Sequence, residues 1–222
     1  WREVVVDRAR TNYETFKNHT SILFWSLGNE SYAGDDIKAM NTYFKERQDG
    51  RLVHYEGSFY TRQYEDTISD VESRMYAKPQ EIEEYLRKNS GKPYISCEYM
   101  HAMGNSLGGM SLYTQLEDKY EAYQGGFIWD YIDQAIITVN DDGRKVLAYG
   151  GDFDDRATDY GFCTNGIVYA DRRYSPKVQE VKQLYSNIKI KIENECITIE
   201  NRNLFADTEN LRFRISLKRN GI

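Results

Sequence analysis

Residues 22–30 read ILFWSLGNE, an apolar run that stops abruptly at Gly28, Asn29 and Glu30. Residues 94–106 read YISCEYMHAMGNS and repeat this pattern, with Glu98 where the apolar run stops. A short apolar run bounded by glycine and polar residues is typical of a strand buried in a parallel sheet. In a β/α barrel, functional side chains sit at the C-terminal tips of such strands. The two stretches therefore predict two strand tips that each carry a carboxylate.

Apolar runs and helix-like segments alternate along the first 187 residues. Runs typical of strands occupy residues 22–25, 52–55, 70–76, 94–97 and 127–131. Apolar residues at helical spacing occupy residues 1–18, 35–44, 79–86, 112–123 and 175–185, whereas residues 56–69 have little helical pattern. Alternating strands and helices imply parallel strands joined by crossovers. The sequence therefore predicts an α/β domain over residues 1–187.

The apolar pattern changes towards the C-terminus. Asp142-Gly143 predicts a tight turn between two short runs, residues 136–139 and 146–149, which form a hairpin. After Asn187, apolar and polar residues alternate, at residues 188–192, 197–199 and 211–217. This period of two predicts antiparallel strands that begin an all-β immunoglobulin-like sandwich over residues 188–222. About three strands are present where a sandwich needs about seven, so we expect this domain to be truncated.

Composition limits the kinds of partner that the protein can bind and indicates the redox state of its compartment. The 222 residues contain 29 Lys and Arg against 35 Asp and Glu, a formal net charge of −6, and no basic stripe, so we expect no nucleic-acid partner. No apolar run approaches the roughly 20 residues of a membrane span, so we expect no membrane partner. Cys97, Cys163 and Cys196 are odd in number and form no C-x-x-C pair. This usage favours a reducing compartment, and we predict the cytoplasm.

The paired glutamates point to one chemistry. Cleavage of a glycosidic bond needs an acid on the leaving oxygen and a carboxylate near the anomeric carbon. Glu30 and Glu98, at matching positions, can supply these two groups. Either glutamate alone is more simply interpreted as an ordinary charged residue at a strand end. The matching positions favour the glycosidase interpretation over two independent surface charges.

Three further residues have two readings each. His101, three residues beyond Glu98, is either a hydrogen-bonded loop histidine or part of a site. Trp129 is either a core residue or a platform for the apolar face of a sugar. Tyr76 closes its predicted strand, and its phenol can hydrogen-bond a carboxylate. The residues alone leave these alternatives open.

Four motifs in fixed order resemble a known family. They are residues 22–30 (ILFWSLGNE), 97–106 (CEYMHAMGNS), 125–130 (GGFIWD) and 162–166 (FCTNG). In this order they resemble the large bacterial β-galactosidases of glycoside hydrolase family 2. The resemblance covers nearly the whole chain and is weakest after Asn187. The run after Glu98 is the most specific motif, because related β-glucuronidases and β-mannosidases keep this glutamate without the HAMGN continuation.

The resemblance implies an activity and its catalytic residues. It implies retaining hydrolysis of terminal β-D-galactosides, of which lactose is the type, through a glutamyl-galactosyl intermediate. Glu98 would be the nucleophile, Glu30 the general acid/base and Tyr76 the residue that orients the nucleophile. A β-galactoside would be the substrate, with Asn29 holding the hydroxyl beside the anomeric centre.

The resemblance also implies the remaining ligand contacts. His101 and Trp129 would hold galactose, the tryptophan as its floor. Glu30 matches a position that helps bind Mg²⁺, whereas the carbonyl of Phe162 and the side chain of Asn165 match ligands of Na⁺. In the family, the other magnesium ligands come from an earlier barrel segment, and one sodium ligand comes from an N-terminal domain.

The fold implied by the resemblance is a TIM (β/α)8 barrel followed by sandwich domains. The five predicted strands match the fourth to the eighth strand of that barrel. We expect the parent protein to form a homo-oligomer, and the isolated 222-residue chain to be inactive because five strands cannot close the barrel. Two alternatives remain: another retaining β-glycosidase, such as a β-glucuronidase, or a non-catalytic carbohydrate-binding fragment.

Overall fold

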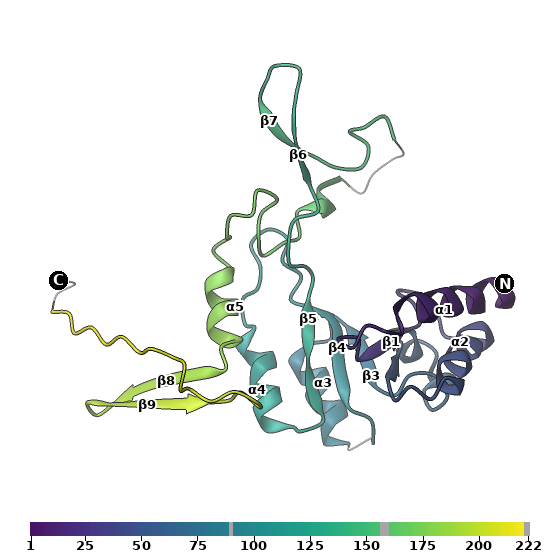
Figure 1. The fold of residues 1–222 in the computed structure, drawn as a ribbon, viewed down its shortest axis with the longest axis horizontal. Helices are drawn as coiled ribbons and strands as arrows, with labels where there is room; N and C mark the ends of the chain where they lie inside the picture. Colours follow the sequence, from purple (N-terminus) through teal and green to yellow (C-terminus); the bar gives the residue numbers. More distant parts are fainter. Residues whose placement is uncertain (89–90, 156–159, 220–222) are drawn as a thin grey trace. The chain divides into compact units, whose positions relative to one another are not determined.

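The computed structural model describes residues 1–88, 91–155 and 160–219 (Figure 1). The chain divides into two compact units, Trp1–Val178 and Gln179–Ile222. The predicted boundary after residue 187 lies nine residues beyond this division and stays a prediction. In the parts that the structure describes, no helix is long and apolar enough to cross a membrane.

The first unit carries five parallel strands in two small sheets (Figure 1). β1 (Phe24–Ser26) pairs with β2 (Leu52–His54), with Trp25 opposite Val53. The second sheet has the order β3–β4–β5, formed by Glu72–Met75, Tyr94–Tyr99 and Tyr123–Ile128. The prediction of five consecutive parallel strands is confirmed.

Helices separate most of these strands, as the apolar spacing predicts. α2 (Asp35–Glu46), α3 (Pro79–Arg87) and α4 (Ser111–Lys119) lie between strands. α1 (Arg2–Phe16) precedes β1, and α5 (Val178–Leu184) comes after β5 and the hairpin that follows it. Between β2 and β3 the chain instead forms two short 3-10 helices, η1 (Glu56–Phe59) and η2 (Arg62–Tyr64). α3 begins at Pro79, where the missing N–H is harmless, and the Glu81 carboxylate accepts the Lys78 N–H at 2.7 Å.

The two sheets adjoin at β2 and β3. In the described chain no ladder of strand-to-strand hydrogen bonds joins β2 to β3. The segment before β3 replaces the ladder with other hydrogen bonds. Val53 donates its N–H to the Asp70 carboxylate at 2.6 Å, and the Asp70 N–H donates to the Val53 carbonyl at 2.8 Å. The Tyr55 N–H donates to Ser69 Oγ at 3.0 Å. These bonds keep β3 beside β2, so the strands form one interrupted row.

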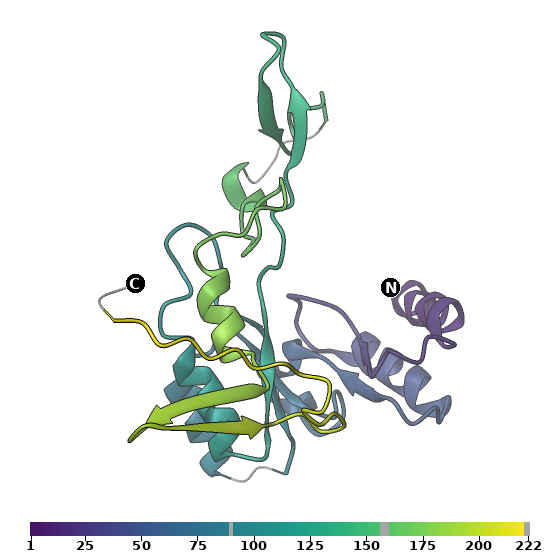
Figure 2. The same cartoon turned by 60° about the vertical axis from the view of Figure 1, so that its left-hand side comes forward.

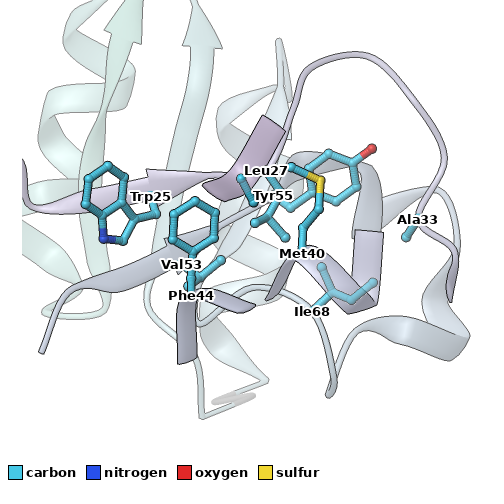
Figure 3. Packing of buried hydrophobic residues seen from close by; sticks show 9 residues of the cluster. Trp25, Leu27, Ala33, Met40, Phe44, Val53, Tyr55 and Ile68 are labelled. Carbon is cyan, nitrogen blue, oxygen red and sulfur yellow. The ribbon is translucent and has the colours of Figure 1, made fainter. Parts of the chain in front are cut away.

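The first core lies between α1, α2 and the β1–β2 sheet. Trp25 and Phe44 stack with ring centroids 5.3 Å apart, and Tyr13 packs against both rings. Figure 3 shows Trp25, Phe44 and Val53 together in this cluster, with Met40 and Tyr55 towards its other end. The apolar face of α2 is therefore buried against the β1–β2 sheet, as its spacing requires.

The second core lies under the β3–β5 sheet. Ile82 and Leu86 of α3 and Leu116 of α4 pack against Tyr94 and Tyr123 of the strands. Figure 2 shows helix α4 beside strand β5 of this sheet. Tyr123 corrects the sequence reading, which placed it on the helix after Leu112. It is the first residue of β5, because α4 ends at Lys119 and the following residues turn the chain into the strand.

β5 also ends earlier than predicted. It runs from Tyr123 to Ile128, so Trp129 and Asp130 lie just beyond the strand, and the peptide bond between them is cis. Gly126 explains the earlier start, because a Cβ there would lie 2.9 Å from the Ser96 Cβ on β4. The glycine pair, which resembles a turn in the sequence, instead allows β5 to lie closely against β4.

Two hairpins follow. β6 (Ile136–Val139) and β7 (Lys145–Ala148) are antiparallel, as the Asp142-Gly143 turn predicts. In the second unit β8 (Ile188–Glu193) pairs antiparallel with β9 (Cys196–Asn201). The expected third strand at residues 211–217 is wrong, because these residues pair with no strand in the described chain. Without a partner strand, period-two alternation alone does not form a ladder.

Candidate active site

Side chains of the site come from the C-terminal ends of four strands of the first unit. Glu30 follows β1, Tyr76 follows β3, Glu98 lies near the end of β4 and Trp129 follows β5. In parallel strands these ends share one edge. The residues that the sequence predicts as catalytic therefore converge on the edge where barrel enzymes have their active sites.

Glu98 and Tyr76 form the best-defined pair of the site. Glu98 lies opposite Met75 in the β3–β4 register, which shifts between Arg74 and Met75. The shift lets the Tyr76 N–H donate to the Glu98 carbonyl at 2.8 Å, and the Tyr76 hydroxyl donates to Glu98 Oε2 at 2.8 Å. Partial burial and this carboxylate raise the pKa of Tyr76. The phenol is therefore a fixed donor to Glu98 near neutral pH.

Glu30 is held differently. It lies four residues beyond β1, its side chain is exposed, and its φ of 52° is in the left-handed region. Its backbone N–H donates to Glu56 Oε1 at 2.5 Å. The charges of Glu30 and Glu98 both act on the Tyr76 hydroxyl and on the Glu56 carboxyl. The two predicted catalytic glutamates therefore both lie near Tyr76 and Glu56. Asn29 immediately precedes Glu30.

Glu56 is a site residue that the sequence reasoning missed. It is 2% exposed and begins η1, directly after Tyr55. Burial raises the pKa of its carboxyl, and the charges of Glu98 and Glu30 raise it further. A signal existed: residues 52–57 read LVHYEG, another apolar run that stops at a glutamate followed by glycine.

His101 and Trp129 are brought together by backbone contacts. The Trp129 N–H donates to the Tyr99 carbonyl at 3.2 Å, and the Ala102 N–H donates to the Trp129 carbonyl at 2.7 Å. The His101 ring lies 5.7 Å from the Tyr76 ring. The Trp129 side chain is 36% exposed, so it is available at the surface and is not a core residue. This exposure favours the platform reading of Trp129.

Three residues at this edge share an unusual backbone conformation. Glu30, Tyr76 and Met100 have φ values of 52°, 54° and 53°. Side chains other than glycine seldom adopt this region, and such residues persist only where the surroundings hold them, commonly at functional sites. Each follows a different strand of the site, so part of the backbone strain in the described chain lies at the predicted active edge, and other non-glycine residues with positive φ lie elsewhere.

A row of hydrogen-bonded side chains crosses β1 to β4 behind the glutamates. Ser26 Oγ lies 3.0 Å from His54 Nδ1, and His54 Nε2 lies 2.8 Å from Ser73 Oγ. Ser73 in turn hydrogen-bonds the Cys97 thiol. Burial lowers the pKa of His54 to about 4 and raises the pKa of Cys97 to about 11. Both groups are therefore uncharged near neutral pH, and they link the two sheets without adding charge beside Glu98.

A cavity of about 230 Å³ adjoins Glu30. Its lining comes from the loop after β1, the segment after β2 and the last residue of β3, namely Glu30, Ser31, Tyr32, Glu56, Tyr60 and Met75. The cavity is small compared with pockets that bury whole ligands. The cavity nonetheless leaves open space beside Glu30, next to the rings of Tyr32 and Tyr60.

The predicted sodium ligands lie next to each other. Asn165 is 2% exposed and donates from Nδ2 to the Phe162 carbonyl oxygen. Asn165 Oδ1 is buried without a hydrogen-bond partner in the described chain. The Phe162 ring lies 6.1 Å from the His101 ring, beside the rest of the site. A backbone carbonyl and an amide oxygen without a partner are both ligand types of a hard cation, and in this structure Asn165 turns Nδ2, not Oδ1, towards the Phe162 carbonyl.

The predicted magnesium ligand fits less well. Glu30 belongs to no group of three or more His, Cys, Asp or Glu residues that are close enough to hold an ion, within residues 1–88, 91–155 and 160–219. The described residues do not by themselves complete a magnesium site. Magnesium at Glu30 stays a prediction.

Comparison with known proteins identifies what the chain resembles. The profile of the glycosyl hydrolases family 2, TIM barrel domain, matches residues 1–190. The chain is 62% identical to a β-galactosidase of Halalkalibacterium halodurans over 94% of its length and 58% identical to one of Clostridium acetobutylicum over 100%. It is 63% identical, over 83%, to a β-galactosidase large subunit of Leuconostoc lactis. The chain spans 20%, 24% and 30% of these relatives, respectively.

Solved structures with similar folds are more distant in sequence. A family 2 glycosyl hydrolase of Bacteroides cellulosilyticus superposes with a TM-score of 0.57 at 15% identity, covering 86% of this chain and 24% of that chain. A β-glucuronidase of Bacteroides uniformis superposes with a TM-score of 0.53 at 13% identity, covering 86% and 27%. At such identities the likeness extends to the fold alone. It agrees with a partial TIM barrel.

Proposed function

This chain belongs to family 2 of the glycosyl hydrolases, and we propose that the full-length protein is a retaining β-galactosidase. The substrates are terminal β-D-galactosides of the lactose type. The high identity to relatives named β-galactosidase supports this substrate class. The catalytic pair is Glu98 and Glu30.

One observation carries the proposal: the Tyr76 hydroxyl donates to Glu98 Oε2 at 2.8 Å, at the strand edge that also carries Glu30. A retaining glycosidase needs two carboxyl groups about 5–5.5 Å apart. It also needs the nucleophile held in one orientation, and the phenol hydrogen bond supports that role. The separation of the two carboxyl groups itself stays a prediction.

In the first step a Glu98 carboxylate oxygen bonds to the anomeric carbon of galactose. The bond from that carbon to the leaving oxygen breaks, and its electron pair stays with the leaving oxygen. The Glu30 carboxyl transfers its proton to this oxygen, so the leaving group departs as a neutral alcohol. The product is a glutamyl-galactosyl ester on Glu98.

In the second step Glu30, now a carboxylate, accepts a proton from water. The water oxygen bonds to the anomeric carbon as the ester bond to Glu98 breaks. Galactose leaves with its original configuration, because two displacements have inverted the centre twice. Both glutamates return to their starting charge states.

The sugar contacts follow from the same edge. Asn29 holds the hydroxyl next to the anomeric centre, His101 donates to the sugar, and the exposed Trp129 ring packs on its apolar face. Na⁺, when bound by the Phe162 carbonyl and Asn165 Oδ1, supplies a positive charge that holds sugar oxygens. We also propose that Mg²⁺ binds Glu30 together with ligands from outside this chain.

The parent protein is further proposed to be a cytoplasmic homo-oligomer with an immunoglobulin-like sandwich that starts near residue 188. The 222-residue chain alone is proposed to be inactive. β1–β2 and β3–β5 form an interrupted row of five strands, whereas a closed barrel needs eight. A chromogenic β-galactoside assay of the purified chain tests this point. Turnover within about tenfold of the usual 10 s⁻¹ would contradict it.

A covalent trap tests the proposed function directly. The full-length protein is incubated with a 2-deoxy-2-fluoro-β-galactoside that carries a good leaving group, which slows the second step more than the first. Peptide mass spectrometry should then find the fluorogalactosyl group on Glu98. Label on another residue, or turnover without any label, would contradict the assignment.

Two alternatives are distinguished by simple assays. A β-glucuronidase would hydrolyse a chromogenic β-glucuronide faster than the matching β-galactoside. A carbohydrate-binding protein without activity would bind galactosides and turn over neither substrate. We expect the β-galactoside to be hydrolysed at least about 100-fold faster, because a site built for a neutral hydroxymethyl group does not pair a carboxylate.

A further inference from the structure

The loop that carries Glu30 is clamped by three consecutive residues, Tyr55, Glu56 and Gly57, which follow β2. We call these three residues the 55–57 clamp. The Tyr55 hydroxyl donates to the Ser31 carbonyl at 2.9 Å and lies 2.5 Å from Ser31 Oγ. Tyr55 is fully buried, so the clamp is fixed to the core beneath it.

Gly57 allows the closest approach in the clamp. A Cβ at this position would lie 2.2 Å from the Ser31 carbonyl oxygen and 2.5 Å from the Tyr55 ring. No side chain fits there without moving backbone, so the loop after β1 rests directly on the Gly57 backbone. The loop after β1 and the turn after β2 therefore form one packed unit.

Glu56 supplies the contact that reaches Glu30. Its buried carboxylate accepts the Glu30 N–H at 2.5 Å, a charge-assisted hydrogen bond in a site with little water. The same Glu30 residue has φ 52°, a conformation that costs free energy unless its surroundings hold it. A buried carboxylate bound to this N–H holds that backbone conformation, and the direction of the Glu30 side chain depends on it.

We propose that Glu56 is the positioning residue for Glu30, acting through the Glu30 backbone N–H to aim the acid/base carboxyl at the leaving oxygen. The inference rests on the proposed function. Glu56 neither bonds to the sugar nor carries a proton to it. Withdrawing its acceptor misplaces Glu30 and leaves the hydrogen bond between Tyr76 and Glu98 in place. Misplacement of a catalytic group by about 1 Å costs on the order of 100-fold in rate.

The test compares leaving groups in the full-length protein. Glu56→Asp keeps the charge, but its side chain is one methylene shorter, so its oxygen no longer reaches the Glu30 N–H. Glu56→Gln has a side chain of the original length and keeps an oxygen that can accept this hydrogen bond. For an alkyl β-galactoside, whose departure needs the proton, Glu56→Asp should lower kcat/KM on the order of 10- to 100-fold. For a dinitrophenyl β-galactoside the loss should be less than about threefold, since its departure needs no proton. Glu56→Gln should largely restore the alkyl rate.

The ratio of the two rates is the measured quantity, because both are taken on one preparation and any unfolded fraction cancels. Glu72→Gln is the matched control: Glu72 is also buried but pairs with Arg62 and Arg74. This control should lower stability and leave the ratio unchanged. In the Glu30→Gln background, Glu56→Asp should change the alkyl rate less than about twofold, since two residues acting as one unit are not additive.

Equal losses for both leaving groups in Glu56→Asp, or full additivity with Glu30→Gln, would overturn the positioning role. An unchanged ratio in Glu56→Asp would overturn it as well. Failure of the proposed function is a separate result, because the unsubstituted protein would then turn over neither galactoside. The two failures are therefore distinguishable in the same set of assays.

Discussion

The two parallel sheets each hold one of the two glutamates, and they hold it in different ways. In the β3–β5 sheet Glu98 is part of a strand ladder, and its carboxylate accepts the Tyr76 hydroxyl at 2.8 Å. In the β1–β2 sheet Glu30 lies in a loop, and its backbone N–H is bound while its side chain is exposed. One glutamate is held by its carboxylate and the other by its backbone.

This difference matches the two roles. A nucleophile must point one oxygen at one carbon, so a hydrogen bond to its other oxygen and a rigid strand are suitable. A group that gives and later takes a proton must work on two different oxygens, so a free carboxyl on a fixed backbone is suitable. Substitutions in the two sheets should therefore have different effects on turnover.

The largest effect is expected for Glu98→Gln in the full-length protein. The amide keeps the shape but cannot form the ester bond, so turnover should fall by at least about 10⁴-fold for every leaving group. Thermal stability should change little, because Glu98 is only half-buried. Residual turnover within about tenfold of the unsubstituted protein would show that the β3–β5 sheet does not carry the nucleophile.

Glu30→Gln should give a loss that depends on the leaving group. For alkyl β-galactosides kcat/KM should fall by about 10²- to 10⁴-fold, the usual contribution of a general acid. For dinitrophenyl β-galactosides kcat/KM should stay within about tenfold, because bond cleavage there needs no proton. A uniform loss would remove the distinction between the two sheets.

His54 connects the sheets and should make their joint stability pH-dependent. Its folded pKa of about 4 lies below its ordinary value of 6.5, so the folded protein binds fewer protons between these values. Stability is fully present above pH 6.5 and should fall by about 3 kcal/mol as the pH decreases towards 4. Thermal unfolding between pH 4 and 7 measures this loss.

Carboxyl groups also titrate between pH 4 and 7. The contribution of His54 is therefore isolated by comparing variants with the unsubstituted protein. His54→Gln should flatten the dependence of unfolding temperature on pH. His19→Gln, at an exposed histidine, should leave the dependence unchanged. Identical pH profiles for His54→Gln and the unsubstituted protein would show that His54 is protonated without cost in the folded state.

The smallest effect is expected for Tyr76→Phe. It removes one hydrogen bond to a charged group, a loss on the order of 10- to 100-fold in kcat. The loss should be similar for good and poor leaving groups, since the Tyr76 hydroxyl hydrogen-bonds Glu98, which attacks the anomeric carbon whatever the leaving group. A strong leaving-group dependence would place Tyr76 with the acid/base instead.

Much of the fold could be predicted because a buried parallel strand requires a continuous apolar run. The strands at Leu52–His54 and Glu72–Met75, and helices α1 to α4, lie within or close to their predicted ranges. The start and end of β5 could not be predicted. The sequence analysis begins this strand after Gly125-Gly126, and only the close contact of Gly126 with Ser96 explains why both glycines belong to it.

The catalytic residues of the candidate site could be predicted from the sequence, whereas the residues that hold them in position could be predicted only in part. The sequence identified Glu30, Glu98 and Tyr76, because each closes an apolar run or a family motif. It did not identify Glu56, although the same pattern ends at that residue. Only burial and the hydrogen bond to the Glu30 N–H distinguish Glu56 from a surface charge.

By itself, the sequence determined the existence and order of the five parallel strands in the first unit, and it identified Glu30 and Glu98 as carboxylates beyond or near the tips of two of them. These features follow from local composition, because apolar runs must be buried and polar residues stop them. The tertiary structure decided which sheet each strand joins, how β2 and β3 are linked, and which atom holds each glutamate. Those outcomes depend on contacts between residues far apart in the chain, such as Glu30 with Glu56 and Tyr76 with Glu98. No local pattern encodes such contacts, since they form only when separate segments pack together.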